Sequence, residues 1–237
     1  MVSVIGVIPA RGGSQRIPRK NIREFRGLPL VGRTIQSMIQ SGIFDAVFVS
    51  TDDAQVKRVA ESFGASVPFL RPAHLATDTA PTGPVVRHAV EVLQALGHKF
   101  DEVCCTYPTA VFSTDKDWSA GLSLLRSRGA RHSLVMSATT FDFPIWRARR
   151  RMADGWGRYI WPQYALERSQ DLEEAVHDAG QFYWATAETW LSGTALDKGD
   201  VLLLMMERWR VVDIDTEEDW VQAEMLHEIL QRRGTIP

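Results

Sequence analysis

Short strand-like runs alternate with helix-like runs over roughly the first 140 residues of the chain. The runs VSVIGVI and AVFVS have the apolar, β-branched composition of buried strands, whereas PLVGRTIQSMIQSG and DAQVKRVAESFG carry apolar residues at helical spacing. Gly, Asp or Ser marks each change of period. This order predicts an α/β fold with a mostly parallel sheet and helices on both of its faces. In such sheets, ligands bind beyond the carboxyl ends of the strands.

The length and the charge of the chain limit the classes of protein it can belong to. A chain of 237 residues fits one domain with an elaborated insertion better than two independent domains, so we expect residues 1–237 to form a single domain. The formal net charge is −2, and charged residues of both signs are mixed along the chain. This balance argues against nucleic acid or an anionic membrane as a partner.

The cysteines and the longest apolar runs indicate the compartment. Cys104 and Cys105 are adjacent in an apolar segment, and this spacing forms neither a disulfide framework nor a cysteine metal site. No apolar stretch approaches the ~18 residues of a membrane span, and the N-terminus has no signal-like lead-in. We therefore expect a soluble, unprocessed, cytoplasmic protein.

The alternation breaks down beyond about residue 140. All eight tryptophans follow position 117, and the segment at about 141–180 combines prolines, glycines and the basic run RARRR. This segment is interpreted as an insertion that serves as a lid, as a subunit interface or as both. The alternative is that its aromatic residues fill a core.

A stretch rich in glycine and arginine, IPARGGSQRIPRKN at residues 8–21, follows the first strand. Its glycines let backbone N–H groups approach a ligand, and its cations favour an anion, so the stretch predicts a polyphosphate site. A solvated basic turn is the alternative, but crowded cations repel one another unless an anion neutralises them. The spacing of neither a P-loop nor a dinucleotide fingerprint is present. The residues expected at this site are Arg11, Gly12, Gly13, Arg16, Arg19 and Lys20, with Asn21 positioned for a base or ribose edge.

Two carboxylates near the C-terminus form a candidate metal site. If VVDID is a strand, Asp213 and Asp215 point to the same face and repel each other, and a Mg²⁺ ion that bridges to phosphate oxygens would relieve this repulsion. The alternative is an acidic cluster at a helix N-terminus, which suits the helix dipole. The same segment predicts a capping box between Thr216 and Asp219.

Two further polar segments are candidates for ligand contacts. Arg71, at a strand end, can reach a phosphate or a base, whereas STDD at residues 50–53 is typical of a helix cap. Thr79 or Thr82 either caps the following helix or contacts a ligand.

In residues 168–184, polar groups alternate with aromatic residues, a mixture that recognises hydroxylated or acidic small molecules. His177 with Asp178 is a weaker candidate for a general base with its orienting partner. The expected substrate contacts are Arg168, Gln170, Asp178 and Gln181.

Taken together, these segments resemble the CMP-sialic acid synthetase family, the acylneuraminate cytidylyltransferases. IPARGGSQRIPRKN is similar to the nucleotide-binding motif of that family, and RPAHLA, SQDL and DIDTEEDW are similar to its later motifs in matching order. FLRP, HDAGQFYW and RWRVVDIDTEEDW look most like the branch that acts on pseudaminic acid. The resemblance covers nearly the whole chain.

The resemblance implies a Rossmann-like fold of the nucleotide-diphospho-sugar transferase type, whose insertion serves a homodimer. It implies the transfer of CMP from CTP to a nine-carbon 2-keto sugar acid, with release of pyrophosphate. Asp213 and Asp215 would carry Mg²⁺ or another divalent ion such as Mn²⁺, and Arg11, Arg16 and Lys20 would complete the catalytic set. The nucleotide site would consist of Arg11, Gly12, Gly13, Ser14, Gln15, Arg16, Lys20, Asn21 and Arg71.

Two departures from the family pattern leave alternatives open. Gln15 stands where the family has a lysine, and a neutral amide does not replace a cation beside phosphates. Tyr107 stands in the place of a family glutamine, so contacts to the sugar there should differ. The chain could therefore act on sialic, legionaminic or another 2-keto acid, or it could be a non-catalytic nucleotide-binding paralogue. The branch also suggests a role in surface glycosylation, such as flagellin decoration.

Overall fold

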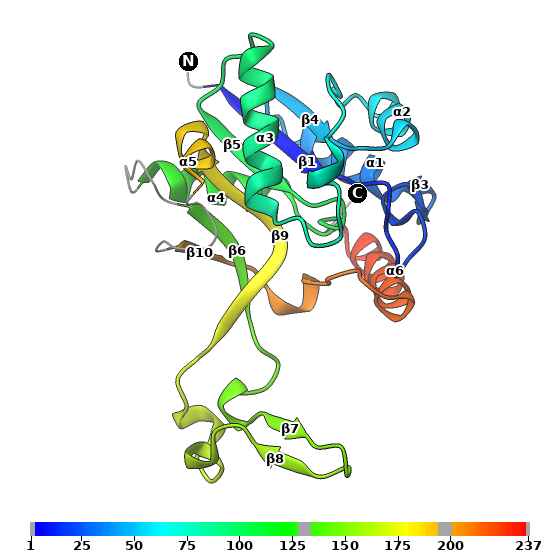
Figure 1. Ribbon diagram of the computed structural model, residues 1–237. Coiled ribbons are helices and arrows are strands. Elements are labelled where there is room, and N and C mark those ends of the chain that lie inside the picture. Colours follow the sequence, from blue (N-terminus) through cyan, green and yellow to red (C-terminus); the bar gives the residue numbers. More distant parts are fainter. Residues whose placement is uncertain (1–2, 128–133, 194–200, 236–237) are drawn as a thin grey trace.

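A computed structural model describes residues 3–127, 134–193 and 201–235. Its centre is a six-stranded sheet with the strand order β10-β6-β9-β5-β1-β4 (Figure 1). The alternation of strand-like and helix-like runs predicted this α/β architecture. The strands of this sheet are β1 (Val4–Pro9), β4 (Ala46–Ser50), β5 (Glu102–Thr106), β6 (Leu134–Thr140), β9 (Val176–Thr186) and β10 (Val201–Met205).

The sheet is mostly parallel, as predicted, with one antiparallel member. β1 pairs in parallel with β4 and β5, and β10 pairs in parallel with β6. β9 runs antiparallel to both of its neighbours, β5 and β6. The start of β9 therefore lies at the same edge of the sheet as the ends of β1 and β5, and the site forms at this edge.

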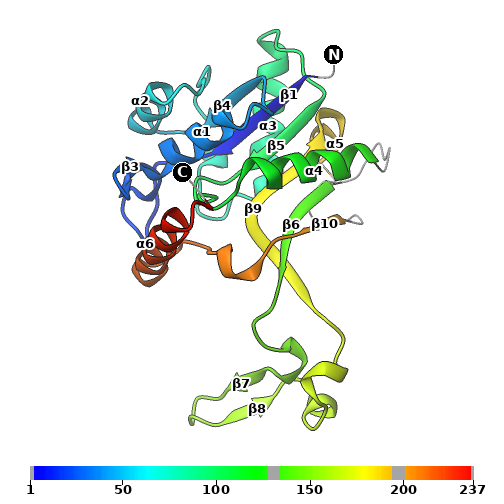
Figure 2. The same ribbon diagram turned by 180° about the vertical axis from the view of Figure 1, so that it is seen from behind.

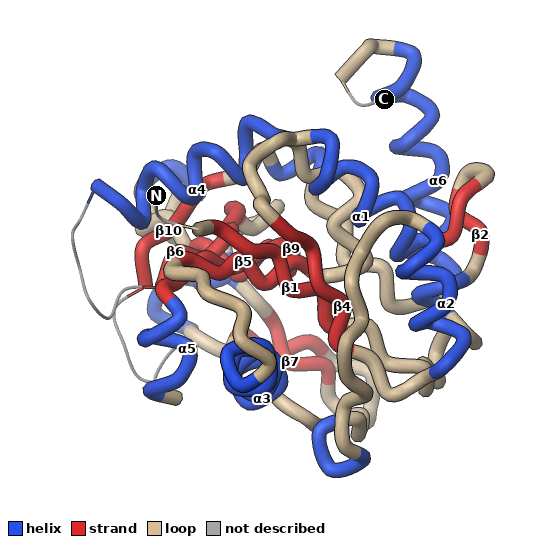
Figure 3. The backbone as a smooth tube through the Cα atoms, turned by 90° about the horizontal axis from the view of Figure 1, so that it is seen from above, coloured by secondary structure: helices blue, strands red, loops and turns tan. Residues whose placement is uncertain are grey.

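Helices cover both faces of the sheet (Figure 3). α1, α2 and α4 contribute to the apolar core on one face, and α3 and α5 contribute to the core on the other. α6 packs on a third cluster built around Phe25, Phe112 and Trp220. The helices are α1 (Leu30–Gln40), α2 (Ala54–Ser62), α3 (Thr82–Ala95), α4 (Asp115–Ser127), α5 (Ala187–Ser192) and α6 (Glu217–Arg232). The short 3-10 helices are η1 (Lys20–Ile22), η2 (Ala73–Leu75), η3 (Ile145–Arg147), η4 (Pro162–Tyr164), η5 (Ser169–Asp171) and η6 (Arg208–Arg210).

Neighbouring residues of a strand enter opposite cores because successive side chains of a strand point to opposite faces. Cys104 belongs to the core beside α1 and α4, whereas Cys105 belongs to the core beside α3. Both thiols are free and buried, and burial raises the pKa of each. The prediction that these cysteines form no disulfide is confirmed.

The segment between β6 and β9 leaves the body of the protein as an extended arm (Figures 1 and 2). It contains a two-stranded antiparallel hairpin of β7 (Arg149–Arg151) and β8 (Gly157–Tyr159), and the rings of Trp146 and Trp161 meet edge to face at 5.6 Å. Trp156 is exposed on this arm. Trp118, Trp184, Trp190 and Trp220, which lie outside the 141–180 segment, are buried in the body.

The segment before α6 is extended but is not a strand, so the strand expected at VVDID is absent. Its side chains still alternate, because Val212 and Ile214 are buried in the cluster under α6 while the two aspartates remain accessible. The alternation of buried and accessible side chains in this segment therefore does not require hydrogen bonds to a neighbouring strand. The capping box predicted at the start of α6 is confirmed, with Thr216 and Asp219 each binding the other's backbone N–H. A small second hairpin, β2 (Glu24–Phe25) with β3 (Leu28–Pro29), precedes α1.

Among the described residues, no helix has the length and apolarity required to cross a membrane.

Candidate active site

A cavity of about 460 Å³ opens beyond the carboxyl ends of β1 and β5, beside the start of β9. This position is the one that a mostly parallel sheet predicts for a ligand site. The cavity brings together residues that are far apart in the sequence. The predicted site residues that line it are Arg11, Lys20, Asn21, Arg71, Tyr107, Asp178, Asp213 and Asp215.

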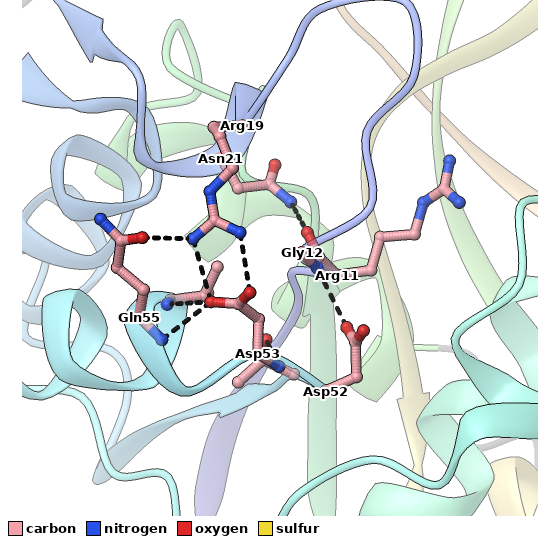
Figure 4. A network of polar contacts seen from close by, with 9 residues as sticks. Arg11, Gly12, Arg19, Asn21, Asp52, Asp53 and Gln55 are labelled. Atoms are coloured by element: carbon pink, nitrogen blue, oxygen red, sulfur yellow. Dashed lines mark hydrogen bonds and ion pairs between the residues drawn. The ribbon is translucent and has the colours of Figure 1, made fainter.

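The loop after β1 is held in place from α2 (Figure 4). Arg19 donates to Asp53 at 2.7 and 3.1 Å and to Gln55 at 2.7 Å. Asp53 also caps α2 by accepting hydrogen bonds from the backbone N–H groups of Gln55 and Val56, and the Arg19 hydrogen bond lowers the pKa of Asp53 to about 2. The helix cap expected in STDD is confirmed. Arg19, however, was expected among the cations for the polyphosphate, and its pairing with Asp53 neutralises it.

Gly12 and Asn21 fix the path of the same loop (Figure 4). The N–H of Gly12 donates to Asp52 at 3.0 Å, and the Asn21 amide donates to the Arg11 carbonyl at 2.8 Å. A Cβ at Gly12 would lie 2.6 Å from the Cβ of Asp53. Gly12 is therefore required because the loop and the start of α2 approach each other closely.

Lys20 and Asp215 join the two predicted halves of the site. Lys20 Nζ donates to Asp215 Oδ1 at 3.0 Å and to the carbonyl of Ile214 at 2.6 Å. Arg16 reaches the other oxygen of Asp215 at 2.8 Å, although its side chain remains largely exposed. The basic loop after β1 and the acidic segment before α6 are therefore in direct contact beside the cavity.

Asp213 has no ion-pair partner among the described residues, although Lys20 and Arg16 act on it from a distance. Desolvation by the cavity walls and the neighbouring Asp215 carboxylate raise the pKa of Asp213. Two carboxylates of this kind fit a divalent cation, since Mg²⁺ is usually held by one or two carboxylates together with phosphate oxygens of the substrate. No cluster of three or more metal-ligating His, Cys, Asp or Glu side chains occurs in the described part of the chain, so the remaining ligands would have to come from the substrate and water.

Arg71 lines the cavity from a buried position. Its guanidinium group donates to the Ser50 hydroxyl at 3.1 Å, to the Ser50 carbonyl, and to the Leu75 carbonyl at 3.4 Å. Burial lowers the pKa of Arg71 to about 10, which leaves it charged at neutral pH. It thus contributes positive charge to the cavity while its donors hold the backbone of two loops.

A hydrogen-bonded group that contains two tyrosines also lines the cavity. Tyr183 donates to Asp178, and Tyr107 shares a hydrogen bond with Thr82. The two rings meet edge to face at 5.9 Å, and burial raises the pKa of Tyr107 to about 12. The other oxygen of Asp178 accepts the N–H of Gly180 at 2.7 Å. Sequence reasoning missed Tyr183, although its position five residues after Asp178 places it on the same strand.

The alternative cap role of Thr82 is excluded, because α3 has Pro81 at its N-cap position and no side-chain cap.

Asp78 is a second residue that the sequence did not reveal. Its carboxylate accepts hydrogen bonds from both Arg11 and Gln15. An acid in the segment before α3 therefore offsets part of the positive charge of the loop after β1. Gln15 therefore binds an acid of the protein itself. No pattern in the sequence signals this contact, because it joins two irregular segments.

The remaining predicted residues lie outside the cavity lining. Gly13 and Ser14 belong to the loop but do not line the cavity. Gln181 is fully buried, and its amide donates to the carbonyl of Ala179. Arg168 and Gln170 lie in or beside η5 on the arm, away from the cavity of the same chain. His177 does not line this cavity either; it lines another beside the arm, and its Nδ1 lies 2.7 Å from the backbone carbonyl of Asp178 and not at the Asp178 carboxylate.

Comparison with known proteins places this geometry in a family. The family profile described as "Cytidylyltransferase" matches residues 5–112. A "Pseudaminic acid cytidylyltransferase" of Campylobacter jejuni is 38% identical over 94% of this chain and 95% of its own length. A "CMP-N,N'-diacetyllegionaminic acid synthase" of Legionella pneumophila is 33% identical over 96% of this chain and 97% of its own.

The solved structure of a CMP:2-keto-3-deoxy-manno-octonic acid synthetase in complex with CTP shares the fold. It covers 96% of this chain and 99% of its own length with a TM-score of 0.71 at 15% identity. This similarity confirms the predicted nucleotidyltransferase fold. Because the relatives match over nearly their full lengths, as the resemblance of the sequence motifs predicted, the chain belongs to the cytidylyltransferase family of nucleotidyltransferases.

Proposed function

We propose that this protein transfers CMP from CTP to pseudaminic acid and releases pyrophosphate. One observation carries the proposal: Arg11, Lys20 and Arg71 share a single cavity with Asp213 and Asp215 at the carboxyl edge of the sheet. Cations that face a carboxylate pair suit a triphosphate bound together with a metal ion. The names of the relatives from Campylobacter jejuni favour pseudaminic acid over other nonulosonic acids.

In this proposal the loop after β1 holds the triphosphate. Arg11 and Arg16, with the loop amides and Ser14, bind the phosphate oxygens, and Lys20 is held at the cavity by Asp215. The anomeric hydroxyl of the sugar acid attacks the α-phosphorus, so that a new O–P bond forms, the bond to the departing pyrophosphate breaks and the hydroxyl proton is released to water. The residues contribute mainly positioning and electrostatic stabilisation.

Asp213 and Asp215 would hold Mg²⁺ or Mn²⁺ at this position. When bound, the ion supplies positive charge toward the triphosphate oxygens. Two features would favour binding of the ion: Asp213 is accessible to the cavity, and Lys20 and Arg16 orient Asp215. Tyr107 and Asp178, which also line the cavity, would contact the sugar acid.

The metal assignment is tested by Asp215→Asn, with pyrophosphate release measured at saturating CTP, sugar acid and Mg²⁺. We expect a loss of about 100-fold or more in turnover, a scale typical of removing one electrostatic group from a transition state. Glu218→Gln is the matched control, since Glu218 is an exposed acid on α6. Turnover by Asp215→Asn equal to that of the control would refute the assignment. If the unchanged protein bound CTP but released no pyrophosphate with any acid, the non-catalytic alternative would hold.

We infer that the arm between β6 and β9 forms the interface of a homodimer. It exposes large apolar side chains, with Phe143 at 82%, Trp156 at 72% and Leu166 at 98% exposure. Apolar side chains gathered on a projecting element are typical of an interaction surface. In such a dimer, Arg168 and Gln170 would reach the cavity of the partner and contact the sugar acid there.

Sedimentation velocity tests this inference. Leu166→Ser should shift the population toward the monomer, while Leu70→Ser, at an exposed leucine outside the arm, should leave it unchanged. A wild-type protein that sediments as a monomer at high concentration would contradict the dimer.

We also infer a cytoplasmic location, which the two free buried thiols support.

A further inference from the structure

A second cavity, of about 490 Å³, lies between the β2–β3 hairpin, α1, the 111–115 segment and α6. It shares no lining residue with the candidate active site. Figure 2 shows β3, α1 and α6 on the same side of the molecule. The proposed reaction does not use this cavity.

The cavity has an excess of positive charge. Arg33 is half-buried, and its terminal nitrogen donates only to backbone carbonyls, those of Phe25 at 3.2 Å and Arg26 at 2.7 Å. Within the described residues no carboxylate pairs with Arg33, and Arg26 reaches Glu228 only at 3.6 Å. Asp115 is the one acidic residue in the lining. Arg33 also lies 5.9 Å from the centre of the Phe25 ring, but no carboxylate among the described residues offsets the partial desolvation of its charge.

Three buried polar atoms around this cavity have no hydrogen-bond partner among the residues that the structure describes. They are the Nε of Arg33, the Oγ of Ser113 and the Nδ1 of His227, and all three residues line the cavity. Ser113 is 3% exposed and His227 is 2% exposed. Buried polar atoms are nearly always hydrogen-bonded, so three unpaired atoms around one cavity indicate a ligand that completes them.

The backbone and the electrostatics support the same conclusion. Arg26 has a φ of 51° and is followed by Gly27 at 86°, so the two form a tight hairpin turn with Arg26 in the left-handed region. That conformation disfavours an arginine, and strain of this kind is often found at functional positions. Burial, Arg33 and Arg26 lower the pKa of His227 to about 4, so the ring is neutral at pH 7 and can donate from one nitrogen.

We propose that this cavity binds a small oxyanion, the phosphate or carboxylate group of a metabolite. Arg26 and Arg33 supply the charge, while the Ser113 hydroxyl and the neutral His227 ring supply further hydrogen bonds. The bound anion offsets the repulsion between the two arginines and pairs the buried donors. The site is separate from the triphosphate loop and does not depend on the reaction proposed above.

Calorimetric titration of inorganic phosphate into the protein saturated with CTP and Mg²⁺, without sugar acid, tests the proposal. Occupied triphosphate sites then do not compete for the probe. We expect one phosphate to bind per chain and Arg33→Met to weaken its binding at least tenfold. Arg58→Met, at an exposed arginine of α2, should bind phosphate like the wild type. A parallel titration with acetate distinguishes a phosphate site from a carboxylate site.

Ser113→Ala is the second variant, because it removes one donor without removing charge, and it should weaken phosphate binding severalfold. Thermal unfolding establishes that each variant is folded. Absence of binding to the wild type up to about 10 mM phosphate, where a millimolar site would be largely occupied, overturns the proposal. Wild-type affinity in both Arg33→Met and Ser113→Ala overturns it as well.

Discussion

Lys20 Nζ lies 3.0 Å from Asp215 Oδ1, although 195 positions separate the two residues in the sequence. This contact joins the loop after β1 to the extended segment before α6. It places a cation of the nucleotide loop directly beside the carboxylate pair. It thus connects two segments that both contribute residues to the cavity lining.

Replacing Lys20 by methionine should lower turnover while leaving the stability of the fold almost unchanged. Lys20→Met keeps the aliphatic stem but removes the charge at the cavity, so we expect turnover to fall about 100-fold while the unfolding midpoint changes little. Steady-state pyrophosphate release measures the first effect, and thermal unfolding measures the second. Lys57→Met is the control, because Lys57 makes only a surface pair with Glu61 on α2. Equal turnover in the two variants would show that Lys20 has no role in the reaction.

Replacing Asp213 by asparagine should affect stability and activity in opposite directions. The amide keeps the shape of the side chain and removes the charge that burial and, next, repulsion from Asp215 disfavour, the two effects that raise the pKa of Asp213. We therefore expect Asp213→Asn to raise the unfolding temperature in buffer without divalent ions and to abolish turnover. A variant that is both less stable and fully active would be incompatible with the proposed role of this carboxylate.

Two substitutions at Asp53 should separate the stability that this residue contributes as the N-cap of α2 from the stability that its ion pair with Arg19 contributes. Asparagine is a good N-cap, so Asp53→Asn should keep the cap of α2 and lose only the charge pairing with Arg19. Asp53→Ala should lose both and be less stable than Asp53→Asn by about 1 kcal/mol. Urea unfolding measures the difference. Equal stability of the two variants would contradict the cap seen at α2.

The Arg19–Asp53 ion pair predicts that the stability of the fold depends on pH. The Arg19 hydrogen bond lowers the pKa of Asp53 from 3.8 to about 2, so its ionised form is favoured in the folded protein. The resulting stability is present above pH 3.8 and is lost as the pH falls toward 2. The gap in stability between wild type and Asp53→Asn should therefore narrow over this range. A gap that stays constant from pH 5 to about 2 would show that the pairing adds no stability.

Asp78 should oppose the binding of CTP. Its carboxylate holds Arg11 and Gln15, and a triphosphate has to displace it from both. Asp78→Asn removes an exposed charge pair of about 1 kcal/mol or less, so the KM for CTP should fall about two- to fivefold. Gln15→Lys should give little gain alone, because the new cation would pair with Asp78, and a larger gain in combination with Asp78→Asn. A rise in KM for Asp78→Asn would mean that the acid helps to order the loop for the nucleotide.

The sequence predicted those parts of the fold that local periodicity determines. Strands such as Val4–Pro9 and Ala46–Ser50 have two buried faces, and α6 begins with a capping box, so each leaves a local pattern. The antiparallel direction of β9 left no such pattern. Strand direction depends on the path of the whole arm and not on the residues of the strand.

The candidate site was predictable where residue type alone indicated the chemistry. Arg11, Lys20 and the two aspartates line one cavity, although the aspartates lie in an extended segment outside the sheet. Contacts between irregular segments could not be predicted. Arg19 was expected to bind phosphate but pairs with Asp53, and Asp78 emerged only from the folded chain.

The measurement that tests the central claim most directly is product formation from CTP and a panel of nonulosonic acids. Purified protein with CTP and Mg²⁺ is incubated separately with pseudaminic, legionaminic and sialic acid, and the CMP-sugar is identified by mass spectrometry alongside pyrophosphate release. We predict CMP-pseudaminic acid as the main product, with kcat/KM for pseudaminic acid at least tenfold above that for the others, a difference of about 1.4 kcal/mol in transition-state binding. Equal or faster turnover of sialic acid, or no CMP-sugar with any of the three, would contradict the account.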